Sequence, residues 1–162
     1  MNQIITQHGW CLNAKMWLNL KAKFKSENYS WQDNERGYFY DSYRDSQWGK
    51  SDTNNNFKMV ICHSLGTRLI NRDTLSKASH AVLINSFFNF IPKDNKKNFT
   101  IRTLKKMEKK IKGGELEVLI KDFITRSYLP NKFEDNMKEL LKIPSKDINS
   151  AILLNDFNKL YF

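Results

Sequence analysis

Apolar residues in the first half of the chain occur in short blocks that predict strands separated by helices. The predicted strands cover residues 4–6, 29–32, 57–62 and 81–84, and apolar residues recur at helical spacing over 14–24 and from 65 to about 75. A polar, glycine-containing loop is expected over 33–56. Strands that are apolar on both faces are typical of parallel sheets. The pattern therefore predicts an α/β fold with a parallel sheet of about four strands, the last of them buried.

At Pro92 the pattern changes to one of helices alone. Residues 100–128 and 131–160 have helical periodicity, with one apolar stripe formed by Ile101, Leu104, Met107 and Ile111. No strand is predicted after Ile91. The sequence thus predicts an α/β domain over residues 1–92, followed by a helical region over 93–162.

Composition and cysteine content restrict the setting of the protein. Of the 162 residues, 40% are hydrophobic and 13% are aromatic, enough to build a packed core. The two cysteines are too few for a disulfide framework and lack the spacing of metal ligands. We see no leader-like start and no apolar run of membrane-spanning length. We therefore expect a soluble, cytoplasmic protein with no metal and no cofactor.

The formal net charge of +10 raises the question of an acidic partner. The excess is spread along the chain, and no nucleic-acid-binding motif accompanies it. We therefore expect neither nucleic acid nor membrane as a partner, although a basic nucleic-acid-binding protein stays a distant alternative. The densest basic segment lies between the apolar positions of the first long helix, and it is either a solvated face or a docking face for an acidic protein. Its members are Arg102, Lys105, Lys106, Lys109, Lys110 and Lys112, and the first four are the candidate partner-binding residues.

Candidate chemistry is concentrated in the segment VICHSLGTRLI, residues 60–70. Here a predicted buried strand passes directly into a helix at Ser64. A serine at such a turn, usually in the pattern Gly-x-Ser-x-Gly, is the nucleophile elbow, whose sharp turn exposes the hydroxyl above the sheet. In this chain Cys62, which we expect to be buried and inert, replaces the first glycine. The alternative is that Ser64 only caps the helix.

A second motif favours the nucleophile. The chain has HGWCLNAKMW from His8, then ERGY from Glu35, and then CHSLG from Cys62. This succession resembles the α/β-hydrolase superfamily, and within it the pimeloyl-acyl-carrier-protein methyl ester esterases of biotin synthesis, cyanobacterial type. The resemblance covers about residues 3–92 with specific motifs and the following helices only in outline.

The resemblance implies a serine esterase in which Ser64 is the nucleophile. It implies that the backbone N–H groups of Trp10 and Leu65 form the oxyanion hole. Phe87 and Phe88 would contact the acyl chain, and the basic residues of the helical region would bind the acidic acyl carrier protein that carries the ester.

The rest of a catalytic triad is missing from the sequence. In this fold the acid and the histidine follow the nucleophile on late loops. His80 precedes a strand, His63 adjoins the serine at a tight turn, and His8 is better placed to brace the oxyanion loop. The later aspartates read as surface charges: Asp94, Asp122, Asp135, Asp147 and Asp156.

Two explanations are therefore open. The chain is a truncated esterase that lacks the final strands, acid and histidine, which its apolar end at Leu160-Tyr161-Phe162 favours. Alternatively, it is a degenerate hydrolase that binds without turnover. In both cases we expect this chain to be inactive or nearly so.

Overall fold

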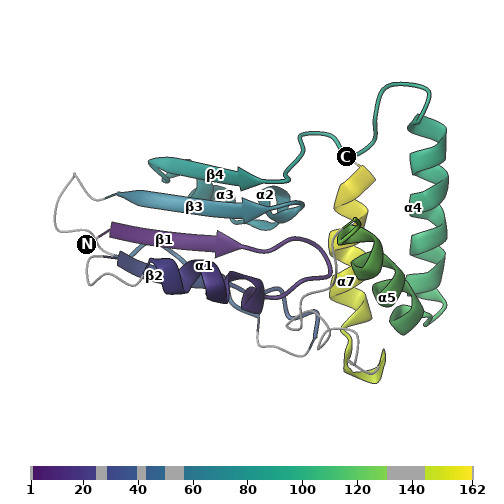
Figure 1. The fold of residues 1–162 in the computed structure, drawn as a ribbon, viewed down its shortest axis with the longest axis horizontal. Coiled ribbons are helices and arrows are strands. Elements are labelled where there is room, and N and C mark those ends of the chain that lie inside the picture. The colour runs from purple at the N-terminus through teal and green to yellow at the C-terminus, as the bar shows by residue number, and fades with distance from the viewer. Residues whose placement is uncertain (1, 25–28, 40–42, 50–56, 131–144, 162) are drawn as a thin grey trace. The chain divides into compact units, whose positions relative to one another are not determined.

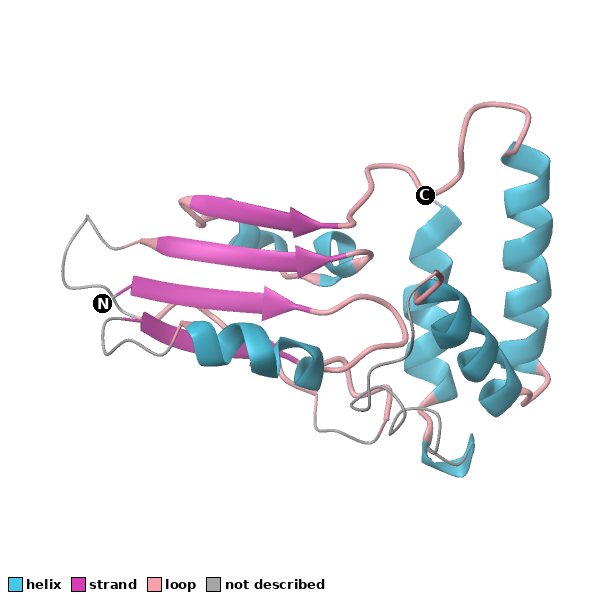
Figure 2. Cartoon of the chain, in the orientation of Figure 1, coloured by secondary structure: helices cyan, strands magenta, loops and turns pink. Residues whose placement is uncertain are grey.

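The structure is a computed structural model that describes residues 2–24, 29–39, 43–49, 57–130 and 145–161. It divides into two compact units, Met1–Gly37 with Asp41–Phe88, and Tyr38–Tyr40 with Asn89–Phe162. The first unit contains the strands and the second is helical (Figures 1 and 2). Among the described residues, no helix is long and apolar enough to cross a bilayer.

The first unit is built on a four-stranded, all-parallel sheet, which confirms the predicted α/β class. Its strands are β1 (Asn2–Gln7), β2 (Tyr29–Asn34), β3 (Lys58–His63) and β4 (His80–Ile84), in the spatial order β2-β1-β3-β4. The register pairs Gln7 with both Asn34 and Cys62, so β1, β2 and β3 end together. The residues that follow these three strands consequently meet at the carboxyl end of the sheet.

Alternating side chains of the central strands build a core on each face of the sheet. On one face Ile4, Met59 and Ile61 pack with Trp17, which lies in the 3₁₀ turn η1 (Ala14–Trp17) that precedes α1 (Leu18–Lys23). On the other face Ile5, Val60 and Cys62 pack with Ile70. This second core also includes Leu75, from the short helices that follow β3. The double-sided burial explains why these strands read as continuous apolar blocks.

Two local predictions were wrong. The helix expected from Leu65 to Leu75 is two helices, α2 (Gly66–Leu69) and α3 (Arg72–Ser76). The break occurs because Ile70 is extended, with ψ 144°, and the Asn71 side chain caps α3 by accepting the N–H of Asp73. Strand β4 is mostly exposed rather than buried, with Leu83 56% exposed. It is an edge strand, which among the described strands pairs with β3 alone.

The second unit consists of amphipathic helices. They are α4 (Lys97–Lys112), α5 (Leu116–Ser127), α7 (Ser150–Phe157) and the 3₁₀ turns η3 (Ser145–Asp147) and η4 (Asn158–Tyr161). The predicted apolar stripe of α4 is confirmed, since Leu104 and Ile111 are buried. The helical prediction for 131–144 lies outside the described residues.

One predicted surface charge is buried instead. Asp156 has no exposed surface, accepts a hydrogen bond from the hydroxyl of Tyr38 at 2.7 Å and pairs with Lys159 at 3.3 Å. Such a carboxylate needs partners to be tolerated in a core. The partner comes from 118 positions earlier in the chain, which is why periodicity in the helical half did not reveal it. Asp135 lies outside the described residues.

Candidate active site

Ser64 occupies a strained turn between β3 and α2. Its backbone φ is +53°, a left-handed conformation that residues other than glycine adopt rarely and at a cost of about 1–2 kcal/mol. Its N–H donates to the carbonyl of Ile84 at 2.9 Å, which fixes the turn to the end of β4. The side chain is half-buried, and none of the described residues forms a hydrogen bond with its Oγ. The conformation holds a hydroxyl at the carboxyl edge of the sheet without a fixed partner.

Two glycines allow the chain to pack closely around Ser64. A Cβ on Gly9 would lie 3.0 Å from both the carbonyl oxygen of His63 and the Cβ of Ser64. A Cβ on Gly66 would lie 2.5 Å from the carbonyl oxygen of Gln7, a distance that real Cβ atoms do not reach. The loop that follows β1 therefore lies directly against the serine turn, as the two sequence motifs predicted. The predicted oxyanion-hole residues flank this contact, since Trp10 follows Gly9 and Leu65 follows Ser64, and their side chains are buried.

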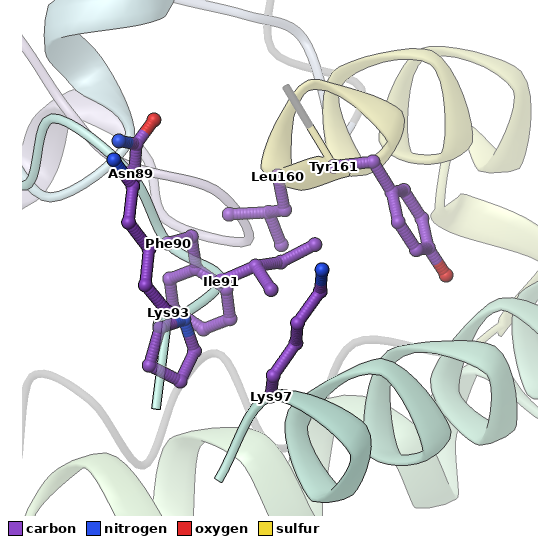
Figure 3. Close-up of a pocket in the computed structure, with 8 residues that line it drawn as sticks. Asn89, Phe90, Ile91, Lys93, Lys97, Leu160 and Tyr161 are labelled. Carbon is purple, nitrogen blue, oxygen red and sulfur yellow. The ribbon is translucent and has the colours of Figure 1, made fainter. Parts of the chain in front are cut away.

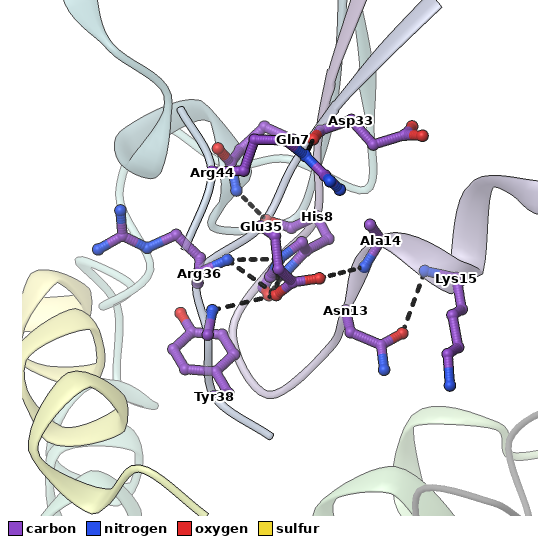
Figure 4. Close-up of polar contacts among 12 residues, drawn as sticks. Gln7, His8, Asn13, Ala14, Lys15, Asp33, Glu35, Arg36, Tyr38 and Arg44 are labelled. Atoms are coloured by element: carbon purple, nitrogen blue, oxygen red, sulfur yellow. Dashed lines mark hydrogen bonds and ion pairs between the residues drawn. The ribbon is translucent and has the colours of Figure 1, made fainter. Parts of the chain in front are cut away.

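A buried network holds the same loop, centred on Glu35 (Figure 4). Glu35 Oε1 accepts the N–H groups of Arg36 at 2.8 Å and Gly37 at 3.1 Å, and Oε2 accepts the N–H of Ala14 at 2.8 Å. His8 Nε2 lies 3.1 Å from Oε1, and both side chains are almost fully buried. Glu35 thus connects the end of β2 to the loop after β1.

His8 links Glu35 to Gly9, the residue packed against Ser64. Its Nδ1 donates to the carbonyl of Gly9 at 2.9 Å, since a carbonyl oxygen can only accept. The predicted role of His8 in bracing the loop agrees with this geometry. Glu35 received no role from the sequence beyond its place in the ERGY motif. The signal that could have found it is register, because His8 and Glu35 each directly follow one of two paired strands.

The electrostatics of this cluster favour an ionised Glu35. Burial alone would raise the pKa of Glu35, but the hydrogen bond and charge of His8, together with the backbone N–H groups of Ala14 and Gly37, outweigh burial and hold that pKa below its usual range. Burial and the charge of His8 lower the pKa of His63. His63 Nδ1 is buried and has no hydrogen-bond partner among the described residues.

No histidine completes a triad with Ser64 in the described part of the chain. His8 is bound to Glu35 and Gly9. His80 pairs with Met59, which lies five residues before Ser64 on β3. Five residues of a strand span about 16 Å, so His80 is at the other end of the strands from Ser64. There it contacts Ser79 and stacks on Phe57, which agrees with the predicted strand-edge histidine.

The remaining predicted site residues lie outside this cluster. Phe87 and Phe88 follow β4, and Phe88 is 90% exposed, while its carbonyl accepts a hydrogen bond from Arg68 of α2. Arg102, Lys105, Lys106 and Lys109 are exposed on α4. The described residues contain no cluster of three or more His, Cys, Asp or Glu side chains able to hold a metal ion.

The cysteine beside the turn is unreactive. Cys62 is fully buried, and burial raises its pKa to about 12. A thiol with such a pKa is protonated at neutral pH and is a poor nucleophile. Ser64, and not Cys62, is therefore the candidate nucleophile of this segment.

Comparisons with known proteins do not identify a family for this chain. The sequence matches no protein-family model and no curated protein.

Proposed function

We propose that this chain carries the nucleophile and oxyanion loop of a serine carboxylic ester hydrolase with an α/β-hydrolase scaffold. The observation that carries the proposal is the left-handed φ of +53° at Ser64, between a parallel strand and a helix, with the Gly9 loop packed against it. A helix-capping serine has extended backbone and does not need this strain. A nucleophile elbow does, because the strained turn is what exposes the hydroxyl.

The strand order supports the same scaffold. In α/β-hydrolases the oxyanion hole combines the N–H of the residue after the nucleophile with an N–H from the loop after an earlier strand. Here Leu65 follows the serine, and the Gly9-Trp10 loop follows β1, the strand directly paired with β3. We therefore assign the two backbone N–H groups to Trp10 and Leu65.

The proposed chemistry is acyl transfer through an acyl-enzyme. Ser64 Oγ attacks the ester carbonyl, and the two backbone N–H groups stabilise the developing oxyanion. The hydroxyl proton passes, through a general base or solvent, to the alkoxide, which leaves as the alcohol. Water then attacks the acyl-serine and releases the acid. On the family resemblance, the substrate is the methyl ester of pimeloyl-acyl carrier protein, the alcohol is methanol and the setting is the cytoplasm.

A second candidate is a binding domain without turnover on the same scaffold. It is favoured by one observation, that no histidine forms a hydrogen bond with Ser64 among the described residues: His8 is bound to Glu35, and His80 lies beside Met59. Loss of triad members lowers turnover by about 10⁴–10⁶. The two candidates share the serine turn and differ in whether Ser64 can be acylated.

Covalent labelling separates them. The chain is incubated with a fluorophosphonate and with p-nitrophenyl butyrate, and adducts are located by peptide mass spectrometry. We expect slow labelling of Ser64, lost in Ser64→Ala and retained in Ser86→Ala, a half-buried serine whose hydroxyl is bound to backbone carbonyls. Labelling that is equal in wild type and Ser64→Ala would contradict the esterase and leave the binding domain.

The proposed carrier-protein partner has its own test. Reversal of Lys105, Lys106 and Lys109 to Glu should weaken binding of an acidic carrier protein at low salt, and high salt should remove the difference, because exposed charges act mainly through screened attraction. The control reverses three other exposed lysines, giving the same change in net charge: Lys15, Lys23 and Lys77. Equal affinity of the two triple variants in a titration would make the lysines of α4 a solvated face.

A further inference from the structure

The helical unit contains a cavity of about 330 Å³ that the esterase proposal does not use. It is formed where the segment before α4 meets the C-terminal turn η4, so residues about 70 positions apart line it (Figure 3). Apolar side chains of Phe90, Ile91, Pro92 and Leu160 form much of its wall. This volume is at the lower end for pockets that bind small organic molecules.

Two ammonium groups accompany the apolar wall. Lys93 and Lys97 line the cavity, and among the described residues neither forms an ion pair. The nearest acid in sequence, Asp94, uses Oδ1 to accept the N–H of Lys96 at 2.9 Å. None of the acidic side chains that the structure describes lines the cavity. The cavity therefore combines apolar surface with two lysine side chains that form no ion pair with a described residue.

The hydroxyl of Tyr161, another residue that lines the cavity, is hydrogen-bonded elsewhere. It points away from the other labelled residues in Figure 3 and donates to Glu108 at 3.3 Å. Glu108 also binds Lys112 at 2.6 Å, so its charge is already paired. Phe90 is 40% exposed, which leaves apolar surface that a ligand would cover.

We propose that this cavity binds a medium-chain carboxylate, with the alkyl chain against Phe90, Ile91 and Leu160 and the carboxylate at Lys93 and Lys97. Carboxylate oxygens accept hydrogen bonds from ammonium groups, and an anion offsets the positive charge. Each methylene removed from water contributes about fourfold in affinity. A ligand with a tail and an anionic head uses both features, whereas phosphate or a simple alcohol uses only one. The inference does not depend on acylation of Ser64.

The test is an NMR titration of the full chain with octanoate below its aggregation concentration. In wild type we expect perturbation of the Ile91 methyl signals and binding about sixteenfold tighter for octanoate than for hexanoate, from two methylenes. Octanol and phosphate should each bind more weakly than octanoate. The Ser64→Ala variant should bind octanoate as the wild type does, which separates this site from the proposed active site.

Charge removal provides the matched variants. Lys93→Gln combined with Lys97→Gln should weaken octanoate binding about threefold to tenfold, since the carboxylate would pair with two exposed lysines. Lys15→Gln combined with Lys23→Gln, which removes the same charge from exposed positions that do not line the cavity, should leave it unchanged. The proposal is overturned by unperturbed Ile91 methyls in wild type, by equal binding of phosphate and octanoate, or by equal effects of the two double variants.

Discussion

Replacement of Glu35 by Gln is the sharpest test of how the loop beside Ser64 is held. The glutamine oxygen can take the place of Oε1 and accept the N–H groups of Arg36 and Gly37. Its amide NH₂ must then face the N–H of Ala14, which Oε2 accepts at 2.8 Å in the wild type. Two donors then face each other in a buried site, and the negative charge next to His8 is lost.

The magnitude follows from these contacts. One unmade buried hydrogen bond costs about 1–3 kcal/mol, and a hydrogen bond to a charged group such as the Glu35 carboxylate contributes about 1.5–3 kcal/mol. Because the glutamine keeps two of the backbone bonds, we expect a loss of about 2–4 kcal/mol in the free energy of unfolding. That is a large part of the roughly 5–15 kcal/mol of an ordinary domain.

Urea unfolding followed by tryptophan fluorescence measures this loss in the structural unit to which Glu35 belongs. All four tryptophans, Trp10, Trp17, Trp31 and Trp48, lie in the unit that contains Glu35. At about 1–3 kcal/mol per molar urea, the midpoint should fall by about 1–2 M. The control is Lys77→Gln, which breaks an exposed pair with Asp73 in the same unit and should cost no more than about 0.5 kcal/mol.

Acid provides a second readout of the same residue. The folded-state pKa of Glu35 lies below its ordinary value, so its stabilisation is complete above the unfolded pKa and is lost as the pH falls through the folded value. The difference between wild type and Glu35→Gln should therefore shrink below about pH 4. Equal urea midpoints at pH 7, or a Lys77→Gln loss as large as that of Glu35→Gln, would refute the reasoning.

Two further results are expected. Gly66→Ala should lower the free energy of unfolding in urea by about 1–3 kcal/mol, because the new Cβ would lie 2.5 Å from the carbonyl oxygen of Gln7. The control Gly49→Ala, whose Cβ would have its nearest contact at 3.5 Å, should change that free energy by less than about 0.5 kcal/mol. Equal losses in the two variants would contradict the close packing at Gly66. Because the folded-state pKa of His63 is lowered, the unfolded chain binds the proton more readily, so stability should fall as the pH drops through about 6.5, and His63→Gln should flatten that slope in urea midpoints measured from pH 8 to 5.5.

The sequence by itself determined the sheet and the serine turn. Blocks such as Val60-Ile61-Cys62 are apolar on both faces, and only a strand between two packed layers buries such a block completely. The serine that follows this block, in Cys62-His63-Ser64-Leu65-Gly66, predicted a sharp strand-to-helix turn. These are local properties, carried by residue type and spacing.

Only the tertiary structure decided which of the other residues meet. Glu35 and His8 are 27 positions apart, and they pair because β1 and β2 are in register and end together. The exposure of β4 depends on its place at the edge of the sheet, and the burial of Asp156 depends on a tyrosine 118 positions earlier. Local pattern reports what a segment can bury, whereas the partner that buries or neutralises it is chosen by the packing of distant segments.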